Sequence, residues 1–388
     1  MAYGLYFTTM PQYQVQADTW RMHLQGLEER NWLLENPQAF LTDLFTPRYA
    51  QDTGPLGTEN SLLNDLKSVL LIKFSAVCSL LTGGRYYVNL VFFTWLTFWG
   101  QVALVRVWQA FFGKSVAAVW IAGAVFLVPN TLFWASGFHK EGVLLHSLGW
   151  MSWLVYRAWQ QKHLTTAALA GLALHAGVLF LLRNYLLAAA VLAGLAALSW
   201  YTFPRQWAAL PAALLAGLGG LWLLSVVWPA IPLPAILAAR QQEFMAMQGQ
   251  SKINRVALPP AWRGFWANLP PAVWYGLPAG PWVLNKLESL PRLGCHLLFL
   301  LGFMPAWRVY WKQGLSPAAK AWLAFGASIF VLHGLLVGYT IPFLAALDRY
   351  DSLLWPFILP PVVVWLMGAL TRKKQPADGL QPLPGANG

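Results

Sequence analysis

The sequence contains little charge and almost no cysteine. Only 10% of its 388 residues are charged, whereas roughly 25% is usual in a soluble domain. A soluble surface needs more charge than this, and Cys78 and Cys295 both lie in apolar runs typical of buried small side chains. The low charge excludes a soluble enzyme and a disordered chain, and the low cysteine content excludes a disulfide scaffold. Walker A, Rossmann glycine, nucleophile-elbow and zinc-protease motifs are also missing, so ATP use and serine hydrolysis have no support.

Apolar residues are abundant instead. Hydrophobic residues make up 57% of the chain, 23 residues are Trp and 22 are Phe, and the mean hydropathy is +0.49. Because lipid cannot hydrogen-bond the backbone, these segments predict an all-α, polytopic integral membrane protein. About nine segments are close to the ~20 residues that a span requires. They are 87–110, 115–134, 142–160, 165–182, 185–203, 207–228, 294–311, 321–341 and 353–370.

Basic and acidic residues lie in different sets of loops. The net charge is +12, which in a soluble protein would point to nucleic acid, but alternate loops here hold Lys and Arg with almost no acidic residue. By the positive-inside rule these loops and the C-terminus are cytoplasmic, and no nucleic acid is expected. The opposite loops hold 13 of the 14 acidic residues and are expected to face outward.

The same pattern predicts five parts of the chain. We expect an outward interfacial segment, a first bundle of six helices, a long outward loop, three C-terminal helices and a disordered cytoplasmic tail. Within the first part, 62–81 has a polar stripe at helical spacing, which favours a helix at the interface over a short span. If this part lies outside, we expect a helix before Met1 that the reading frame lacks. The five parts are 1–85, 86–228, 229–293, 294–371 and 372–388.

Ionisable residues gather on the outward side. His139, Lys140 and Glu141 stand together at the start of a helix, where Glu141 either favours the helix dipole or joins a site for an anionic ligand and proton transfer. Their adjacency makes a poor metal site. Arg183 interrupts an apolar stretch, either as a short hairpin turn in which it reaches headgroups or as a phosphate contact. Arg349 is either an ion-paired cap between two aspartates or a second phosphate contact.

Two other outward regions have alternatives. Asp18 is either a helix N-cap or a general base that faces the outer cavity. The 229–293 loop is rich in Pro and Trp, which predicts a rigid extended segment at the headgroup belt. Sugar binding by its exposed aromatic faces is the alternative.

Several motifs together resemble a known family. Phe133-Trp134-Ala135-Ser136-Gly137 with Lys140-Glu141 resembles a loop of the C-type membrane glycosyltransferases and of related exopolysaccharide polymerase-like proteins of bacteria. The resemblance extends over most of the chain in patches. The other matching segments contain Gln242 and Ser251 in the long loop, Arg349-Tyr350 near the last helix, and Asp18 in the first outer loop. The chain departs from the family in lacking the tandem acidic pair that some members have, since Thr19 follows Asp18.

The resemblance implies a glycosyltransferase of the bacterial inner membrane. Its partners would be a polyprenyl-phosphate-linked sugar, a glycan or lipid acceptor, and membrane lipid. Asp18 and Glu141 would act on the acceptor proton, and basic residues would hold the phosphate. No cofactor is certain, and a divalent cation stays open. The alternatives are a polysaccharide polymerase or ligase, a lipid or oligosaccharide transporter, and a structural membrane partner. The implied substrate-binding residues are His139, Lys140, Arg183, Gln242, Ser251, Arg349 and Tyr350.

Overall fold

The computed structural model is helical throughout the part of the chain that it describes. The described residues are 2–9, 18–43, 62–112, 117–203, 209–228, 232–249, 251–277, 290–312 and 315–372. Every regular element among them is a helix, and the extended backbone is limited to one isolated bridge between Lys252 and Phe343. The prediction of an all-α chain is confirmed. The predicted tail beyond Arg372 lies outside the described residues.

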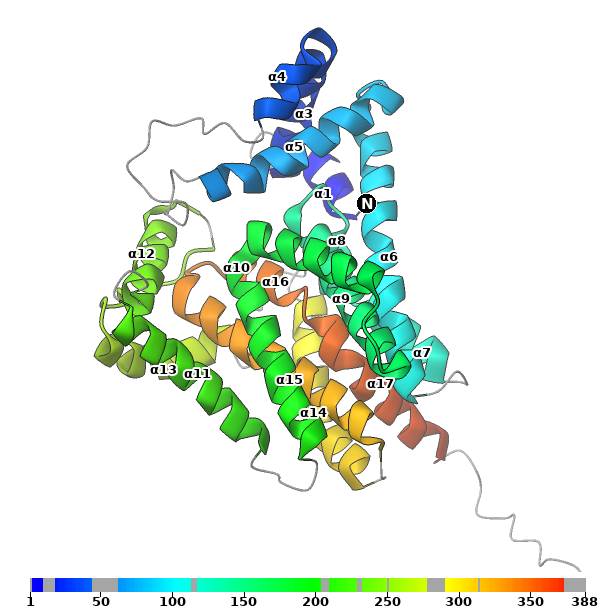
Figure 1. The fold of residues 1–388 in the computed structure, drawn as a ribbon, viewed down its shortest axis with the longest axis vertical. Coiled ribbons are helices and arrows are strands. Elements are labelled where there is room, and N and C mark those ends of the chain that lie inside the picture. The colour runs from blue at the N-terminus through cyan, green and yellow to red at the C-terminus, as the bar shows by residue number, and fades with distance from the viewer. Residues whose placement is uncertain are drawn as a thin grey trace, which may run out of the picture.

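Four helices near the N-terminus form a cap on one end of the molecule (Figure 1). They are α1 (Ala2–Thr9), α3 (Asp18–Glu35), α4 (Pro37–Thr42) and α5 (Leu62–Thr82). In Figure 1, helix α5 crosses the end of the bundle at a steep angle to α6 (Tyr86–Phe112). The interfacial position of this segment stays a prediction.

The described part of the polar stripe on α5 faces protein. Ser75 and Ser79 are buried; Gly26 of α3 lies against Ser75, and Asn89 of α6 donates a 2.7 Å hydrogen bond to Ser79. We expected these side chains to mark a face at the membrane interface, and that reason was wrong. A polar stripe serves equally well for hydrogen bonding to a neighbouring helix, which sequence spacing cannot distinguish. The rest of the stripe, Asn64 and Ser68, has side chains outside the described set.

The bundle below the cap begins with the close pair α6 and α9 (Lys140–Gln161). A Cβ atom on Gly149 would overlap the backbone of Gly100, so the two helix backbones touch at this crossing. Small residues permit such an approach between helices in lipid. The crossing fixes the start of α9, where the ionisable residues stand, at a defined depth beside α6.

Helix α10 (Thr166–Thr202) is longer than a bilayer requires and bends in its middle. At Arg183 the backbone leaves the helical region, with φ −154° and ψ 83°. The backbone N–H of Tyr185 donates to the Asn184 side chain at 2.8 Å, which supports the start of the second arm. The two spans that we predicted over 165–182 and 185–203 are therefore the two arms of one bent helix (Figure 1).

Two further helix pairs are broken. Helices α7 (Ala117–Phe126) and α8 (Pro129–Ala135) meet at 49°, and α16 (Leu344–Asp351) meets α17 (Trp355–Arg372) at 69°. Pro129 accounts for the first break, because a proline removes a backbone donor and disfavours helical geometry in the residue before it. Thr131 donates to the backbone oxygen of Ser352 at 2.5 Å, so the two breaks lie against each other.

The long loop predicted over 229–293 is not an extended segment. It contains α12 (Leu233–Ala246) and α13 (Trp262–Gly276), and α13 includes Pro270 and Pro271. The expectation of extended structure was wrong because adjacent prolines can lie within a helix whose face packs on a neighbour. That neighbour is α15 (Pro317–Thr340), where Gly276 lies directly on the Gly334 backbone.

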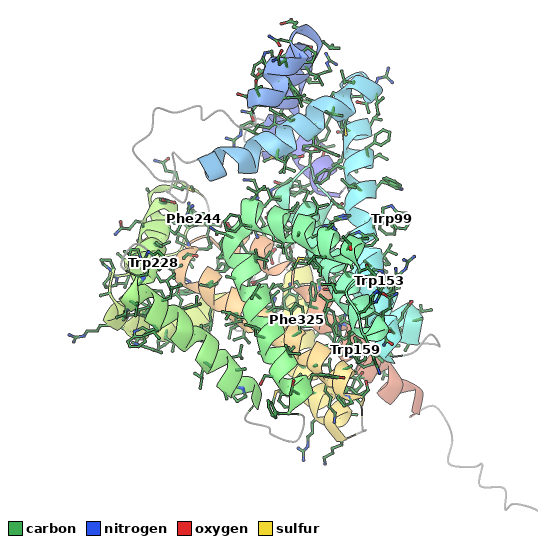
Figure 2. The ribbon with its side chains drawn as sticks, in the orientation of Figure 1. Trp99, Trp153, Trp159, Trp228, Phe244 and Phe325 are labelled. Atoms are coloured by element: carbon green, nitrogen blue, oxygen red, sulfur yellow. The ribbon has the colours of Figure 1, made fainter. Side chains whose placement is uncertain are left out.

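Two more helices complete the fold, α11 (Ala209–Val227) and α14 (Leu290–Lys312). By length and composition, four described helices could cross a membrane, or six if each broken pair counts as one span. Helix α9 is not among them, since its Trp, Ser and His residues lower its hydropathy. Trp99, Trp159 and Trp228 lie exposed on the surface, as expected for side chains that face lipid (Figure 2). The protein is thus a helical membrane protein, and the count of nine spans stays a prediction.

Candidate functional site

The candidate site is built around one buried carboxylate. Glu141, in the first turn of α9, is 0% exposed. Its Oε1 accepts hydrogen bonds from Nη2 of Arg183 and, at 2.7 Å, from Nε of Arg349. Its Oε2 lies against Nδ1 of His139. Residues from three separate stretches of the sequence therefore meet on a single side chain, and four of the predicted site residues are brought together.

His139 holds the position before α9. It is the N-cap residue of that helix, its side chain makes no capping bond, and it is 0% exposed. Burial lowers the pKa of His139 well below 6.5, and the nearby charges of Arg349, Arg183 and Lys140 lower it further. The imidazole is therefore neutral at physiological pH, and the contact with Glu141 is one between a neutral ring and a carboxylate. Lys140 is half-buried beside them.

Arg183 lies at the bend of α10 and points into the protein. Its side chain is 5% exposed, and its guanidinium lies 3.8 Å from the ring centre of Tyr350. The alternative in which Arg183 reaches lipid headgroups is wrong, because a charge this deeply buried requires a partner inside the protein, and Glu141 is that partner. Its Nη1 is buried with no hydrogen-bond partner among the described residues.

Arg349 reaches the site from α16, the short helix before the second break. Its neighbour Asp348 points to α8, where it accepts hydrogen bonds from Asn130 Nδ2 at 3.0 Å and from Trp134 Nε1 at 3.2 Å. The guanidinium of Arg349 lies 6.0 Å from the Trp134 ring. The two adjacent residues thus have different roles. Asp348 hydrogen-bonds α16 to α8 and so joins the two broken helix pairs, and Arg349 contributes a positive charge to the site.

Two aromatic residues that we did not predict, Tyr185 and His333, stand beside Arg183 and the predicted Tyr350. The rings of Tyr185 and Tyr350 are nearly parallel, at 10° and 6.4 Å, and His333 stacks on both at 6.0 and 6.3 Å. His333 is 0% exposed, and neither ring nitrogen has a hydrogen-bond partner among the described residues. The sequence offered only the weak signal that Tyr185 follows Arg183 and Asn184, and none for His333.

The N-terminal helices cover the site. Tyr3 of α1 is buried, its backbone N–H donates to Ser136 Oγ at 3.2 Å, and its ring lies 5.2 Å from that of His139. Thr19 of α3 accepts a 3.2 Å hydrogen bond from the backbone N–H of Phe138. Asp18 is the first residue of α3 and precedes Thr19, but its side chain lies outside the described residues. The start of α3 therefore contacts the linker that holds His139.

Two predicted residues lie away from Glu141. Gln242 is exposed on α12, whereas its neighbour Gln241 is buried and donates to the backbone oxygen of Tyr339 at 2.9 Å. The oxygen of the Gln241 side chain accepts from Leu258 N at 2.5 Å, so the buried glutamine supports the fold of the outer region. The Ser251 backbone oxygen accepts a 3.0 Å hydrogen bond from Leu344 N, which fixes the start of α16. Ser251 therefore contacts the site only indirectly, because α16 carries Arg349.

The charges at the centre favour an anion. One carboxylate faces two guanidinium groups, Lys140 stands next to it, and the imidazole is neutral. Guanidinium groups match phosphate geometry with paired donors, and a buried site strengthens the attraction. Among the described residues, no group of three His, Cys, Asp or Glu side chains is placed to hold a metal ion.

Comparisons with known proteins add no relative. No family model, no curated protein and no solved structure matches the chain. The resemblance to C-type membrane glycosyltransferases therefore stays a prediction from the motifs quoted above.

Proposed function

We propose that this protein is a membrane glycosyltransferase that uses a polyprenyl-phosphate-linked sugar. The supporting observation is that Arg183 and Arg349, 166 residues apart in the numbering, converge on the buried carboxylate of Glu141. Arg183 is buried and the Arg349 side chain is 22% exposed. Removing guanidinium groups from water is costly unless they serve a ligand or a partner, and Glu141 neutralises only one of the two charges. An anionic leaving group is the ligand that such a pair fits.

The reaction assigns a task to each group. The acceptor hydroxyl oxygen forms a bond to the anomeric carbon, the bond between that carbon and the phosphate oxygen breaks, and the phosphate leaves with the electron pair. Arg183, Arg349 and Lys140 stabilise the negative charge that develops on it. The acceptor proton passes to Asp18, and Glu141 with His139 positions the two guanidinium groups.

The proposed orientation follows from the charges. The cap and the Glu141 site face outward from a bacterial inner membrane, and the C-terminus is cytoplasmic. On this proposal nine segments cross the membrane, with the arms of α10 as two of them. The acceptor is a glycan or a lipid at the outer face, and membrane lipid surrounds the bundle.

Reconstitution tests this function. The full-length protein in liposomes should transfer sugar from a polyprenyl-phosphate donor, and Arg349→Ala should reduce the rate at least a hundredfold because a leaving-group contact is lost. Asp18→Asn should reduce it similarly. Arg240→Ala is the matched control, since Arg240 pairs with Glu243 on α12 away from the site and should keep the full rate. Full transfer by both Arg349→Ala and Asp18→Asn would overturn the proposal.

One observation favours a second candidate, a transporter of lipid-linked saccharides. The broken pairs α7–α8 and α16–α17 meet beside the site, and broken helices next to buried charges are frequent in transporters. In the same liposomes, movement of a labelled polyprenyl-linked sugar across the bilayer without transfer would support this candidate. Transfer without movement would support the enzyme.

A further inference from the structure

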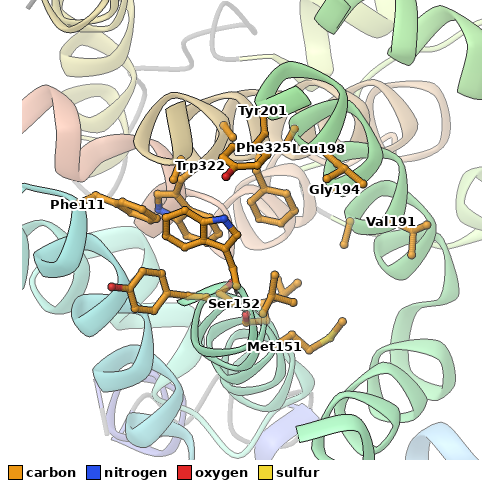
Figure 3. Close-up of a pocket in the computed structure, with 17 residues that line it drawn as sticks. Phe111, Met151, Ser152, Val191, Gly194, Leu198, Tyr201, Trp322 and Phe325 are labelled. Carbon is orange, nitrogen blue, oxygen red and sulfur yellow. Dashed lines mark hydrogen bonds between the residues drawn. The ribbon is translucent and has the colours of Figure 1, made fainter. Parts of the chain in front are cut away.

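An apolar cavity lies within the bundle, on the cytoplasmic side of the site in the proposed orientation. It has a volume of about 310 Å³ and lies between α6, α9, α10 and α15. Trp322 and Phe325 of α15 form one wall, Met151 of α9 lies below, and Val191 and Leu198 of α10 lie opposite (Figure 3). Its size is at the lower end of the ~300–1,000 Å³ typical of ligand sites.

The cavity opens toward lipid. Val155, Val191 and Leu198 line it and are each more than half exposed, on helices whose outer surface is apolar. Most of the lining is apolar, although it includes Ser152, Tyr156 and Tyr201. A recess of this kind in a membrane protein therefore suits hydrocarbon from the bilayer better than a water-soluble ligand. Its occupant is therefore an apolar chain.

On two helices, the first cavity residue follows a residue of the charged site at the same interval. On α9, Leu148 of the cavity follows Glu141 by seven residues, and on α10, Ala190 follows Arg183 by seven. At 1.5 Å per residue each interval is about 10 Å along the helix axis. An anionic headgroup at Arg183 and Arg349 would thus lead, within about two helical turns, to an apolar recess for the chain attached to it.

We infer that this cavity binds the isoprenoid chain of the lipid carrier whose phosphate occupies the Glu141 site. The inference rests on the proposed function. Such a ligand has its headgroup on the outward side and its chain toward the membrane interior, which is the order in which the two sites are stacked. The broad aromatic faces of Trp322 and Phe325 suit a methyl-branched chain, which is thicker than a straight acyl chain.

Two glycines of α10 provide a matched test. Gly194 lines the cavity, and a Cβ atom there would meet nothing within 4 Å. A Cβ atom on Gly177 would also meet nothing within 4 Å, but Gly177 does not line the cavity. Gly194→Phe therefore fills the recess without a clash at Cβ, and Gly177→Phe makes the same chemical change on the same helix elsewhere.

Binding of radiolabelled farnesyl phosphate to the full-length protein in nanodiscs should separate these variants. We expect Gly194→Phe to weaken binding at least tenfold, and Gly177→Phe to leave it within twofold of the unsubstituted protein. In case Gly194→Phe does not fold, a photoreactive farnesyl phosphate is added to the unsubstituted protein. It should label residues in 148–159, 190–201 or 318–325, and labelling confined to segments that do not line the cavity would overturn the inference.

The outcomes distinguish the two proposals. If Gly194→Phe binds normally while Arg349→Ala does not, the anion site stands and the cavity inference fails. If Arg349→Ala binds normally while Gly194→Phe does not, the cavity stands and the proposed function loses its phosphate contact. If straight-chain hexadecyl phosphate binds the unsubstituted protein as tightly as farnesyl phosphate, the assignment to an isoprenoid chain is overturned.

Discussion

At the scale of single residues, the dominant feature is a buried carboxylate that two guanidinium groups share. Taking Glu141 out of water costs several kcal/mol, and the attraction of Arg183 and Arg349 offsets that cost only if the geometry is good. Such a cluster stabilises a protein little compared with an apolar core of the same size. We therefore interpret it as a functional arrangement, and the neutral His139 beside it as part of the same group.

His139 should make stability depend on pH. In the folded protein its pKa is held well below 6.5, by burial first and by Arg349, Arg183 and Lys140 next. The unfolded chain takes up a proton as the pH falls below about 6.5, whereas the folded protein does not. The free energy of unfolding therefore decreases toward acid by up to about 1.4 kcal/mol per pH unit, and above that range the residue has no such effect.

The measurement is chemical unfolding in detergent at a series of pH values. His139→Gln should lose less stability than the unsubstituted protein between about pH 7 and pH 5, since only the imidazole takes up this proton. His163→Gln, an exposed histidine after α9, is the control and should follow the unsubstituted protein. Parallel curves for His139→Gln and the unsubstituted protein would show that the imidazole is not held neutral by its surroundings.

At the scale of elements, glycine contacts set how closely helices pack. The pairs α6–α9 and α13–α15 each touch backbone to backbone, through Gly100 with Gly149 and through Gly276 with Gly334. The second contact turns a region that reads as a loop into a helix fixed on α15. It also connects the outer region to His333, one residue before Gly334, and so to the site.

Gly276→Ala should separate α13 from α15. A Cβ atom at this position would overlap the carbonyl oxygen of Gly334, and overpacking of this kind costs about 1–3 kcal/mol. Thermal unfolding in detergent should show a lower Tm. Gly220→Ala on α11 is the matched control, because its Cβ would meet nothing within 4 Å and alanine favours the helix by up to about 1 kcal/mol. An equal Tm for the two variants would refute the backbone contact.

At the scale of the whole molecule, the cap lies at one end of the long axis (Figure 1). The site lies at the start of α9, in contact with the cap, and the cavity is lined further along α9, from Leu148 to Trp159. The cap covers the site through Tyr3 and Thr19, and the cavity lies beyond the site. The proposed function places the cap outside and the short loop after α9 in the cytoplasm.

Single cysteines should report that orientation. After Cys78 and Cys295 are replaced by alanine, a cysteine at Gln248 beyond α12 should react with a membrane-impermeant maleimide in intact spheroplasts. A cysteine at Gln161, at the end of α9, should react only after lysis, because loops rich in Lys and Arg stay in the cytoplasm. Both positions are exposed, so reactivity reports the side of the membrane. The reverse pattern would invert the topology.

The sequence alone determined the fold class and part of the candidate site. Composition required a helical membrane protein, since lipid leaves the backbone no other solution, and charges in apolar surroundings identified His139, Glu141, Arg183 and Arg349. These features depend on local chemistry and on the solvent. Local patterns also misled: the Pro- and Trp-rich stretch is a helix, and Gln241, not Gln242, is the buried glutamine.

Only the tertiary structure decided how those residues combine. The contact between Glu141 and Arg349 joins residues 208 positions apart, and it exists because α9 and α16 are placed by glycine crossings and by two helix breaks that lie together. The same packing brought Tyr185 and His333 to the site, although only Tyr185 had a weak signal in its neighbours and His333 had none. Periodicity determines which face of a helix is apolar, but the neighbour against which that face packs is set by the free energy of the whole bundle.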